Sequence, residues 1–149
     1  DEEHLFQSVH NLVKHTHSHP NTLTSARNLT QILIELSKRA EIRNVLNTFR
    51  MSDVPLNKIK AWENMPDRKV VGETLSTACY LPESFTAALY FAWKYSDDFS
   101  LAVLANAKVG GDNCHRGVVV GSIVAMQTGI PEKWLRDLKC MDELRCDQS

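Results

Sequence analysis

The residues best suited to chemistry form one polar turn framed by glycines, Gly110-Gly111-Asp112-Asn113-Cys114-His115-Arg116-Gly117. Paired glycines adopt backbone angles that other residues avoid, and they let main-chain amides approach a ligand closely. A helix is predicted to begin at Asn113, so Asp112 lies in the positive field of its N-terminus and stays ionised. Two interpretations of Asp112 remain open: a metal ligand that faces outward, or a cap of its own helix.

The residues after Asp112 carry further reactive groups. Cys114 can be a soft metal ligand, an activated thiolate or a small buried filler, and the last is favoured because free cysteine behaves as a small hydrophobe. His115 can act as an acid or base near neutral pH, or be a surface histidine. Arg116 can hold a diphosphate through charge-assisted hydrogen bonds, or form a salt bridge at the start of the helix.

The elements that must position this turn are predicted to be helices. Apolar residues recur at helical spacing, Asn21 or Thr22 is the expected cap of the second helix, and Gly129 is the expected end of the helix after the turn. The predicted helices cover residues 3–14, 22–39, 42–49, 82–95, 98–107 and 113–128, and Pro131 begins the last one. Residues 51–81 are expected to form a long connection with one short helix near 56–64.

Small residues define one face of the helix after the turn. Gly117, Gly121 and Ala125 recur every four residues, which predicts close contact with another helix. Glycine inside a helix lowers helix stability by about 1 kcal/mol relative to alanine, so we expect close packing to offset this loss. No strand pattern is found, and we expect one all-α domain over residues 1–149.

Composition excludes several classes of function. Apolar residues make up 43% of the chain, and 17 basic against 18 acidic residues leave a formal charge of −1. This balance argues against nucleic acid or an anionic membrane as a partner, and no apolar run reaches the roughly 20 residues of a membrane span. Four cysteines without a paired spacing predict reduced thiols and a cytoplasmic protein. The start at Asp1 suggests a chain cut from something longer.

Other groups have weaker patterns. His15, His17 and His19 alternate before Pro20, which invites a zinc site, but no cysteine or acid accompanies them. Tryptophan can stack on adenine, yet tryptophan at helical spacing is more often core, as expected for Trp93.

Three blocks of the sequence resemble one family, the ADP-ribosylglycohydrolases. Gly-Gly-Asp at 110–112, followed by a helix with Gly117 and Gly121, is similar to the signature near the family's C-terminus. Residues 16–20 resemble its Thr-His segment, and residues 83–90 resemble the helix before the signature. The order and spacing of the three blocks agree, and together they cover most of the chain.

The resemblance implies an all-helical hydrolase that releases ADP-ribose from modified side chains, typically arginine or serine. A water bound to one of two magnesium ions would attack the anomeric carbon. Asp112 would hold a metal, His115 or Asn113 would contact ribose or water, and His17 would border the ADP-ribose pocket. The chain would be the C-terminal half of the fold, and the missing N-terminal half would be its partner and supply other acids.

The turn also departs from the family's usual pattern, Gly-Gly-Asp-x-Asp-Thr. Cys114 stands in place of the second aspartate and His115 in place of the threonine. Magnesium prefers oxygen ligands, whereas thiolate and imidazole suit zinc and softer metals. The string from Asn113 to Arg116 resembles a branch that includes the J-type lens crystallins. A structural or ADP-ribose-binding protein without catalysis, and a zinc-dependent helical protein, are therefore the alternative functions.

Overall fold

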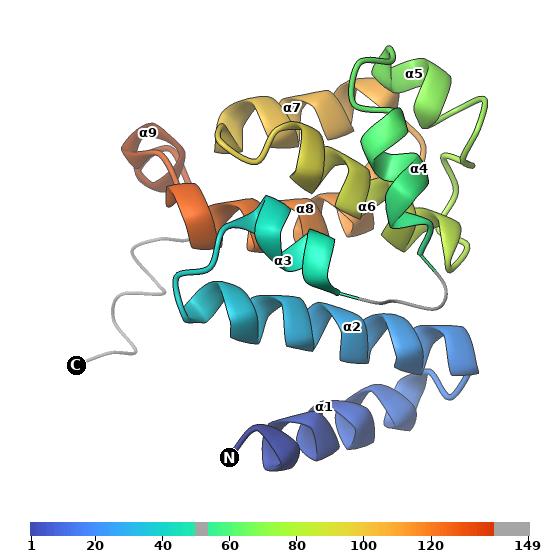
Figure 1. Cartoon of the computed structure of the whole chain (residues 1–149), viewed down its shortest axis with the longest axis vertical. Helices are drawn as coiled ribbons and strands as arrows, with labels where there is room; N and C mark the ends of the chain where they lie inside the picture. Colours follow the sequence, from blue (N-terminus) through green and yellow to red (C-terminus); the bar gives the residue numbers. More distant parts are fainter. Residues whose placement is uncertain (50–53, 139–149) are drawn as a thin grey trace.

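The computed structural model describes residues 1–49 and 54–138 and shows an all-helical chain, with one isolated β-bridge between Val71 and Leu75 in those ranges (Figure 1). None of the helices in these ranges is both long and apolar enough to cross a membrane. In chain order the helices are α1 (Glu2–Thr16), α2 (Pro20–Ser37), α3 (Ile42–Thr48), α4 (Leu56–Ala61), α5 (Asp67–Val70), α6 (Glu83–Lys94), α7 (Phe99–Val109), α8 (Asn113–Thr128) and α9 (Glu132–Arg136).

Helix α6 forms the centre of the core. Every residue from Ser84 to Trp93 is buried, because α3, α4, α7 and α8 all pack around this helix. A helix that is apolar on all sides needs such cover. The prediction that Trp93 belongs to the core is confirmed, since only 7% of the residue is exposed. Fully buried side chains from neighbouring helices complete the core: Ile32, Ile42, Leu46, Ile59, Val70, Ala102, Val120 and Ile123.

Helices α7 and α8 pack closely against each other, as the small-residue pattern predicts. A Cβ atom at Gly117 would lie 3.2 Å from the Nδ2 atom of Asn106 on α7. A Cβ atom at Gly121 would lie 3.9 Å from the Phe99 ring, which is ordinary van der Waals contact. The close approach is therefore concentrated at Gly117, one turn from the start of α8.

Helix α2 begins differently from the prediction. The imidazole Nδ1 atom of His19 accepts a hydrogen bond of 3.2 Å from the Asn21 amide, so His19 is the cap, and neither Asn21 nor Thr22 is. Pro20 then occupies the first turn, where its missing N–H costs nothing. Proline also disfavours helical angles at the residue before it, which explains why the cap lies at His19.

The predicted connection over residues 51–81 is only partly irregular. It contains α4, which lies inside the expected short helix, and also α5, which the sequence pattern did not indicate. Residues 50–53 and the C-terminal tail from 139 onward, which includes Cys140 and Cys146, lie outside the described residues.

Helix α1 packs on α2 at the edge of the molecule and buries none of its residues (Figure 1). Its apolar stripe is only partly covered. Phe6, Val9 and Val13 are half-buried, whereas Leu5 and Leu12 remain 43% and 74% exposed. Helical periodicity thus identifies this helix correctly but does not say how much of its apolar face is covered.

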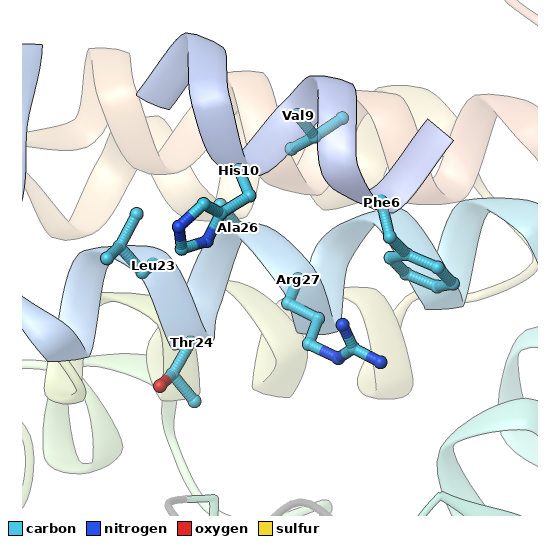
Figure 2. Close-up of a pocket in the computed structure, with 7 residues that line it drawn as sticks. All are labelled: Phe6, Val9, His10, Leu23, Thr24, Ala26 and Arg27. Atoms are coloured by element: carbon cyan, nitrogen blue, oxygen red, sulfur yellow. The ribbon is translucent and has the colours of Figure 1, made fainter. Parts of the chain in front are cut away.

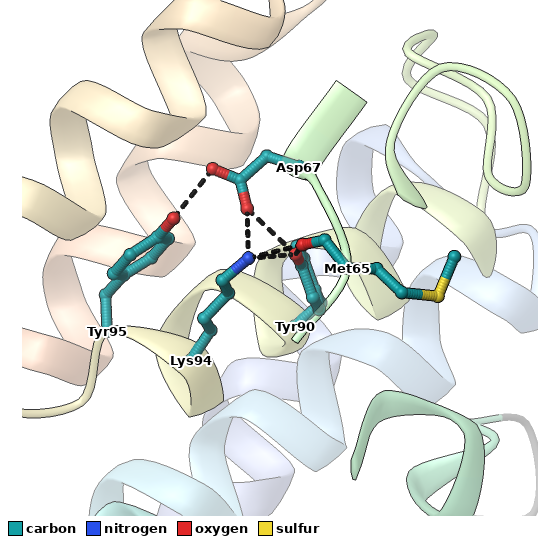
Figure 3. Close-up of polar contacts among 5 residues, drawn as sticks. All are labelled: Met65, Asp67, Tyr90, Lys94 and Tyr95. Carbon is teal, nitrogen blue, oxygen red and sulfur yellow. Dashed lines mark hydrogen bonds and ion pairs between the residues drawn. The ribbon is translucent and has the colours of Figure 1, made fainter. Parts of the chain in front are cut away.

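A polar cluster joins α5 to the C-terminal end of α6 (Figure 3). The Asp67 carboxylate accepts hydrogen bonds from Lys94 Nζ at 2.8 Å, Tyr90 Oη at 2.8 Å and Tyr95 Oη at 2.7 Å. Lys94 also donates to the Met65 carbonyl at 2.6 Å. Burial alone would raise the pKa of the Asp67 carboxyl, but the three donors outweigh it and hold the pKa below its ordinary value.

We expect glycine to be required at position 117 and dispensable at position 121. Gly117→Ala should lower the free energy of unfolding by about 1–3 kcal/mol, because the new methyl group meets the buried Asn106 amide. Gly121→Ala is the matched control and should be neutral or stabilising by up to about 1 kcal/mol, since alanine favours the helix. Urea unfolding of both variants checks this, and equal effects would contradict it.

We expect Asp67→Asn to lower the free energy of unfolding at neutral pH by about 2–3 kcal/mol, because Lys94 loses its charged partner. The pKa of Asp67 is depressed in the folded protein, so its contribution is present above the ordinary pKa of 3.8 and is lost as pH falls through the lower folded value. The stability gap between wild type and variant should therefore shrink below about pH 4. Tyr95→Phe, which removes one hydrogen bond, should cost about 1 kcal/mol. A gap that is constant from pH 7 to pH 3 would contradict this assignment.

Candidate functional site

The glycine turn between α7 and α8 is seated against the loop over residues 72–82. Gly110 and Gly111 have φ angles of 77° and 65°, which L side chains rarely adopt. A Cβ atom at Gly111 would overlap the backbone and side chain of Thr77. The Asp112 amide donates a hydrogen bond of 2.9 Å to the Thr77 carbonyl. Glycine is therefore needed at position 111 both for the backbone angle and for the contact with the loop.

Asp112 begins α8 without capping it. Its carboxylate makes no capping hydrogen bond, and Oδ1 instead lies 2.6 Å from Nδ1 of His115, three residues later. The hydrogen bond from His115 holds the pKa of the Asp112 carboxyl below its ordinary value, against an opposing effect of desolvation. The charge of His115 and the Cys79 thiol lower this pKa further. Asp112 is thus an ionised carboxylate paired with an imidazole.

The Asp112–His115 pair can perform acid–base chemistry. An ionised carboxylate can only accept hydrogen bonds, so it selects the imidazole form that carries hydrogen on Nδ1. The other nitrogen, Nε2, is then left to accept a proton from water or a substrate. The His115 side chain is 84% exposed and the Asp112 side chain 25% exposed, so a substrate can reach the imidazole.

Arg116 occupies a different place from the one its predicted roles need. The residue is 1% exposed, and its guanidinium donates to the Asn106 side chain at 2.6 Å and to the carbonyls of Gly110 at 2.9 Å and Thr77 at 3.3 Å. Burial lowers the pKa of this guanidinium, while the charge of Asp112 acts in the opposite direction. The guanidinium therefore faces protein oxygens rather than a diphosphate, and no carboxylate of the described residues forms a salt bridge with it.

The other predicted site residues are spread over the same region. Asn113 is half-buried, its Nδ2 atom donates to the Gly111 carbonyl at 3.1 Å, and its own carbonyl accepts from Asn106. Cys114 is exposed, so the expectation that it fills a buried space is wrong: this position in the first turn of α8 faces solvent. His17 ends α1, is exposed, and has Nδ1 2.8 Å from the Thr16 hydroxyl.

Loop 72–82 connects the two predicted parts of the site. Asn21, near the start of α2, donates to the Leu81 carbonyl at 3.3 Å, while Thr77 accepts from the glycine turn. The α1–α2 turn that carries His17 and the first turn of α8 are thus tied to the same loop. Within residues 1–49 and 54–138, no hydrogen bond or ion pair joins His17 to Asp112, and the sequence resemblance alone relates those two residues.

Three residues that matter here escaped the sequence reasoning: Thr77, Cys79 and Asn106. Thr77 acts through its carbonyl, and the Cys79 thiol lowers the pKa of the Asp112 carboxyl, so neither has a recognisable sequence signal. Asn106 did have a signal in the sequence, because it follows Ala102 and Ala105 at helical spacing and so lies on an apolar stripe. A polar residue on such a stripe needs buried hydrogen-bond partners. In the structure Asn106 is only 2% exposed, and Ala102 and Ala105 are buried.

The residues at the turn do not by themselves fit a two-magnesium centre. Over residues 1–49 and 54–138 there is no group of three or more His, Cys, Asp or Glu side chains placed to hold a metal ion. Asp112 is one carboxylate, and magnesium requires about six oxygen ligands. The zinc site suggested by alternating histidines is not formed either: His15 Nδ1 lies against the Asn11 carbonyl, whereas His19 caps α2.

Two cavities in the described part of the chain lie away from the turn. One, of about 220 Å³, opens between α1 and α2, where Arg27 stacks over the Phe6 ring beside His10 (Figure 2). Another, of about 300 Å³, borders Trp134 near the C-terminal end of the described chain. Neither is lined by Asp112 or His115. The Asp112–His115 pair is therefore a surface feature in this arrangement of the chain.

Comparison with known proteins gives one match. The family model described as ADP-ribosylglycohydrolase covers residues 1–147. No curated protein and no solved structure matches the chain significantly.

Proposed function

Because the chain belongs to the ADP-ribosylglycohydrolase family, we propose that it takes part in hydrolysis of ADP-ribose linkages, with Asp112 and His115 as its acid–base pair. The observation that carries this proposal is the 2.6 Å contact between a carboxylate that does not cap its helix and an accessible imidazole. The all-helical fold agrees with the family assignment.

The proposed chemistry is activation of a water molecule by His115. Asp112 holds hydrogen on Nδ1, so Nε2 accepts a proton from water as the water oxygen bonds to the anomeric carbon. The bond from that carbon to the modified side chain breaks, and the leaving group takes a proton from solvent. Asp112 stabilises the imidazolium that forms, because it is a fixed negative charge 2.6 Å away.

A metal-bound water is the nucleophile that the family resemblance implies. The family is metal-dependent, but Asp112 alone cannot complete such a centre, and Cys114 is a poor ligand for magnesium. Any centre would need further oxygen ligands from outside the described residues. The resemblance assigns those acids to an N-terminal half of the same fold.

We propose that this N-terminal half also covers the Asp112–His115 pair and completes a site for ADP-ribose. A His115 side chain that is 84% exposed is not shielded from bulk water, whereas a hydrolase site normally excludes it. His17 and Asn113 would border the ribose, since both regions are tied to loop 72–82. The free thiols of Cys79 and Cys114 are compatible with a reducing, cytoplasmic setting.

We expect His115→Ala to slow release of ADP-ribose from a modified protein by about 10²–10⁴-fold, measured with the N-terminal half present. Asp112→Asn keeps the shape but removes the charge, and should also slow release. Ser122→Ala, an exposed position on the same helix, is the control and should act like wild type. Unchanged release by Asp112→Ala would refute the proposed role of this carboxylate.

A second function is supported by the same turn. Cys114 and His115 replace the aspartate and threonine of the family pattern, and the described residues lack a three-ligand group. A protein that keeps the fold but has lost the metal centre, as in the crystallin-like branch, would show both features. Its role would be structural, or binding of ADP-ribose without turnover.

Calorimetry with ADP-ribose distinguishes these functions. For the hydrolase we expect ADP-ribose to bind and magnesium to tighten the binding, because the cation would be coordinated by the ribose hydroxyl oxygens. An affinity for ADP-ribose that does not change with magnesium would support an ADP-ribose-binding protein, and no binding would support a structural protein. Stoichiometric zinc in the purified protein would instead support the zinc alternative.

A further inference from the structure

The buried guanidinium of Arg116 stands out because no carboxylate in residues 1–49 or 54–138 forms a hydrogen bond or ion pair with it. Its partners among the described residues are uncharged oxygens: the Asn106 side chain and the carbonyls of Asn106, Gly110 and Thr77. It also lies 6.0 Å over the ring of Phe91, in the central helix α6. A charge is costly to bury, so its partners must be held in place to satisfy its donors.

The guanidinium and the backbone of Asp112 converge on one atom. The Thr77 carbonyl accepts from Arg116 Nη1 at 3.3 Å and from the Asp112 amide at 2.9 Å. Another terminal nitrogen, Nη2, donates at 2.9 Å to the Gly110 carbonyl, at the beginning of the glycine turn. Arg116 therefore links the loop to the turn on both sides of Gly111, which fixes where α8 starts.

Asn106 makes the second connection. Its Oδ1 atom accepts from Arg116 Nε at 2.6 Å, and its Nδ2 atom donates to the Asn113 carbonyl at 2.9 Å. Both the oxygen and the nitrogen of the Asn106 amide are therefore hydrogen-bonded, which determines the orientation of the amide. Gly117 leaves the space that this amide needs, since a Cβ atom there would lie only 3.2 Å from Nδ2.

We infer that Arg116, held by Asn106, is the positioning residue for the Asp112–His115 pair. It ties α7, the glycine turn and loop 72–82 into one arrangement, in which the Asp112 carboxylate meets His115 instead of capping α8. The significance of this role for catalysis rests on the proposed function. The effect of Arg116 on the geometry of the turn can be tested without substrate.

A guanidinium suits this role better than an ammonium group. Its planar fork directs Nε, Nη1 and Nη2 at three separate acceptors at once, whereas lysine offers one flexible point charge. Arg116→Lys therefore keeps the charge and most of the volume but cannot reach all three acceptors. It separates the geometry of the fork from the mere presence of a positive charge.

The test follows two NMR signals in Arg116→Lys at one neutral pH. We expect hydrogen exchange of the Asp112 amide, which is bonded to Thr77, to become about tenfold faster or more. We also expect the ¹⁵N shift of His115 Nδ1 to move toward that of a free imidazole. Asn106→Ala should change both signals in the same direction, and it decides the question if Arg116→Lys does not fold.

Ile123→Ala is the matched control. Ile123 is fully buried on the same helix, so this variant lowers overall stability without touching the turn. Its Asp112 exchange, corrected for global stability, and its His115 shift should match wild type. Wild-type signals in Arg116→Lys, or the same changes in Ile123→Ala, would overturn the inference. Positive results here combined with no hydrolysis would refute only the proposed function.

Discussion

A buried positive charge that pairs with no carboxylate in the described part of the chain constrains this structure more than any other interaction at the site. Arg116 is 1% exposed, so water cannot satisfy the donors of its guanidinium, and protein oxygens must. Those oxygens come from α7, from the glycine turn and from loop 72–82, and they lie up to 39 positions from Arg116 along the chain. In the described residues no buried side-chain nitrogen or oxygen lacks a partner. The turn therefore has little freedom to rearrange while the core stays intact.

This constraint explains why Asp112 is available for chemistry. An aspartate before a helix ordinarily accepts hydrogen bonds from the first-turn amides. Here the Asp112 amide is anchored to Thr77 and the carboxylate turns to His115, three residues further on, which lies on the same face of the helix. The result is an ionised acid beside an exposed imidazole, on a rigid support formed by α7 and α8.

The sequence predicted the helices well because their periodicity reflects which faces are buried. Gly117 and Gly121 also predicted the α7–α8 contact, since small residues are informative about how closely helices approach. How deeply each side chain of the turn is buried was harder to predict. Arg116 was expected to hold a diphosphate or to form a salt bridge, and Cys114 was expected to be buried. In the structure Arg116 is buried and Cys114 is exposed, because spacing along one turn does not say which side faces a neighbouring helix. Contacts through backbone oxygens, such as that of Thr77, leave no trace in residue type.

Cys114 and His115, which stand in place of the family's aspartate and threonine, change the chemistry that this turn favours. Aspartate and threonine oxygens suit a hard cation, whereas the imidazole of His115 suits proton transfer and is already engaged by Asp112. A metal at Asp112 would compete with this imidazole for the same Oδ1 atom. The packing of Gly117 and Arg116 does not depend on that competition, so the fold can persist whichever chemistry operates. Family membership therefore predicts the architecture, while under the proposed function the activity depends on which partner the Asp112 carboxylate binds.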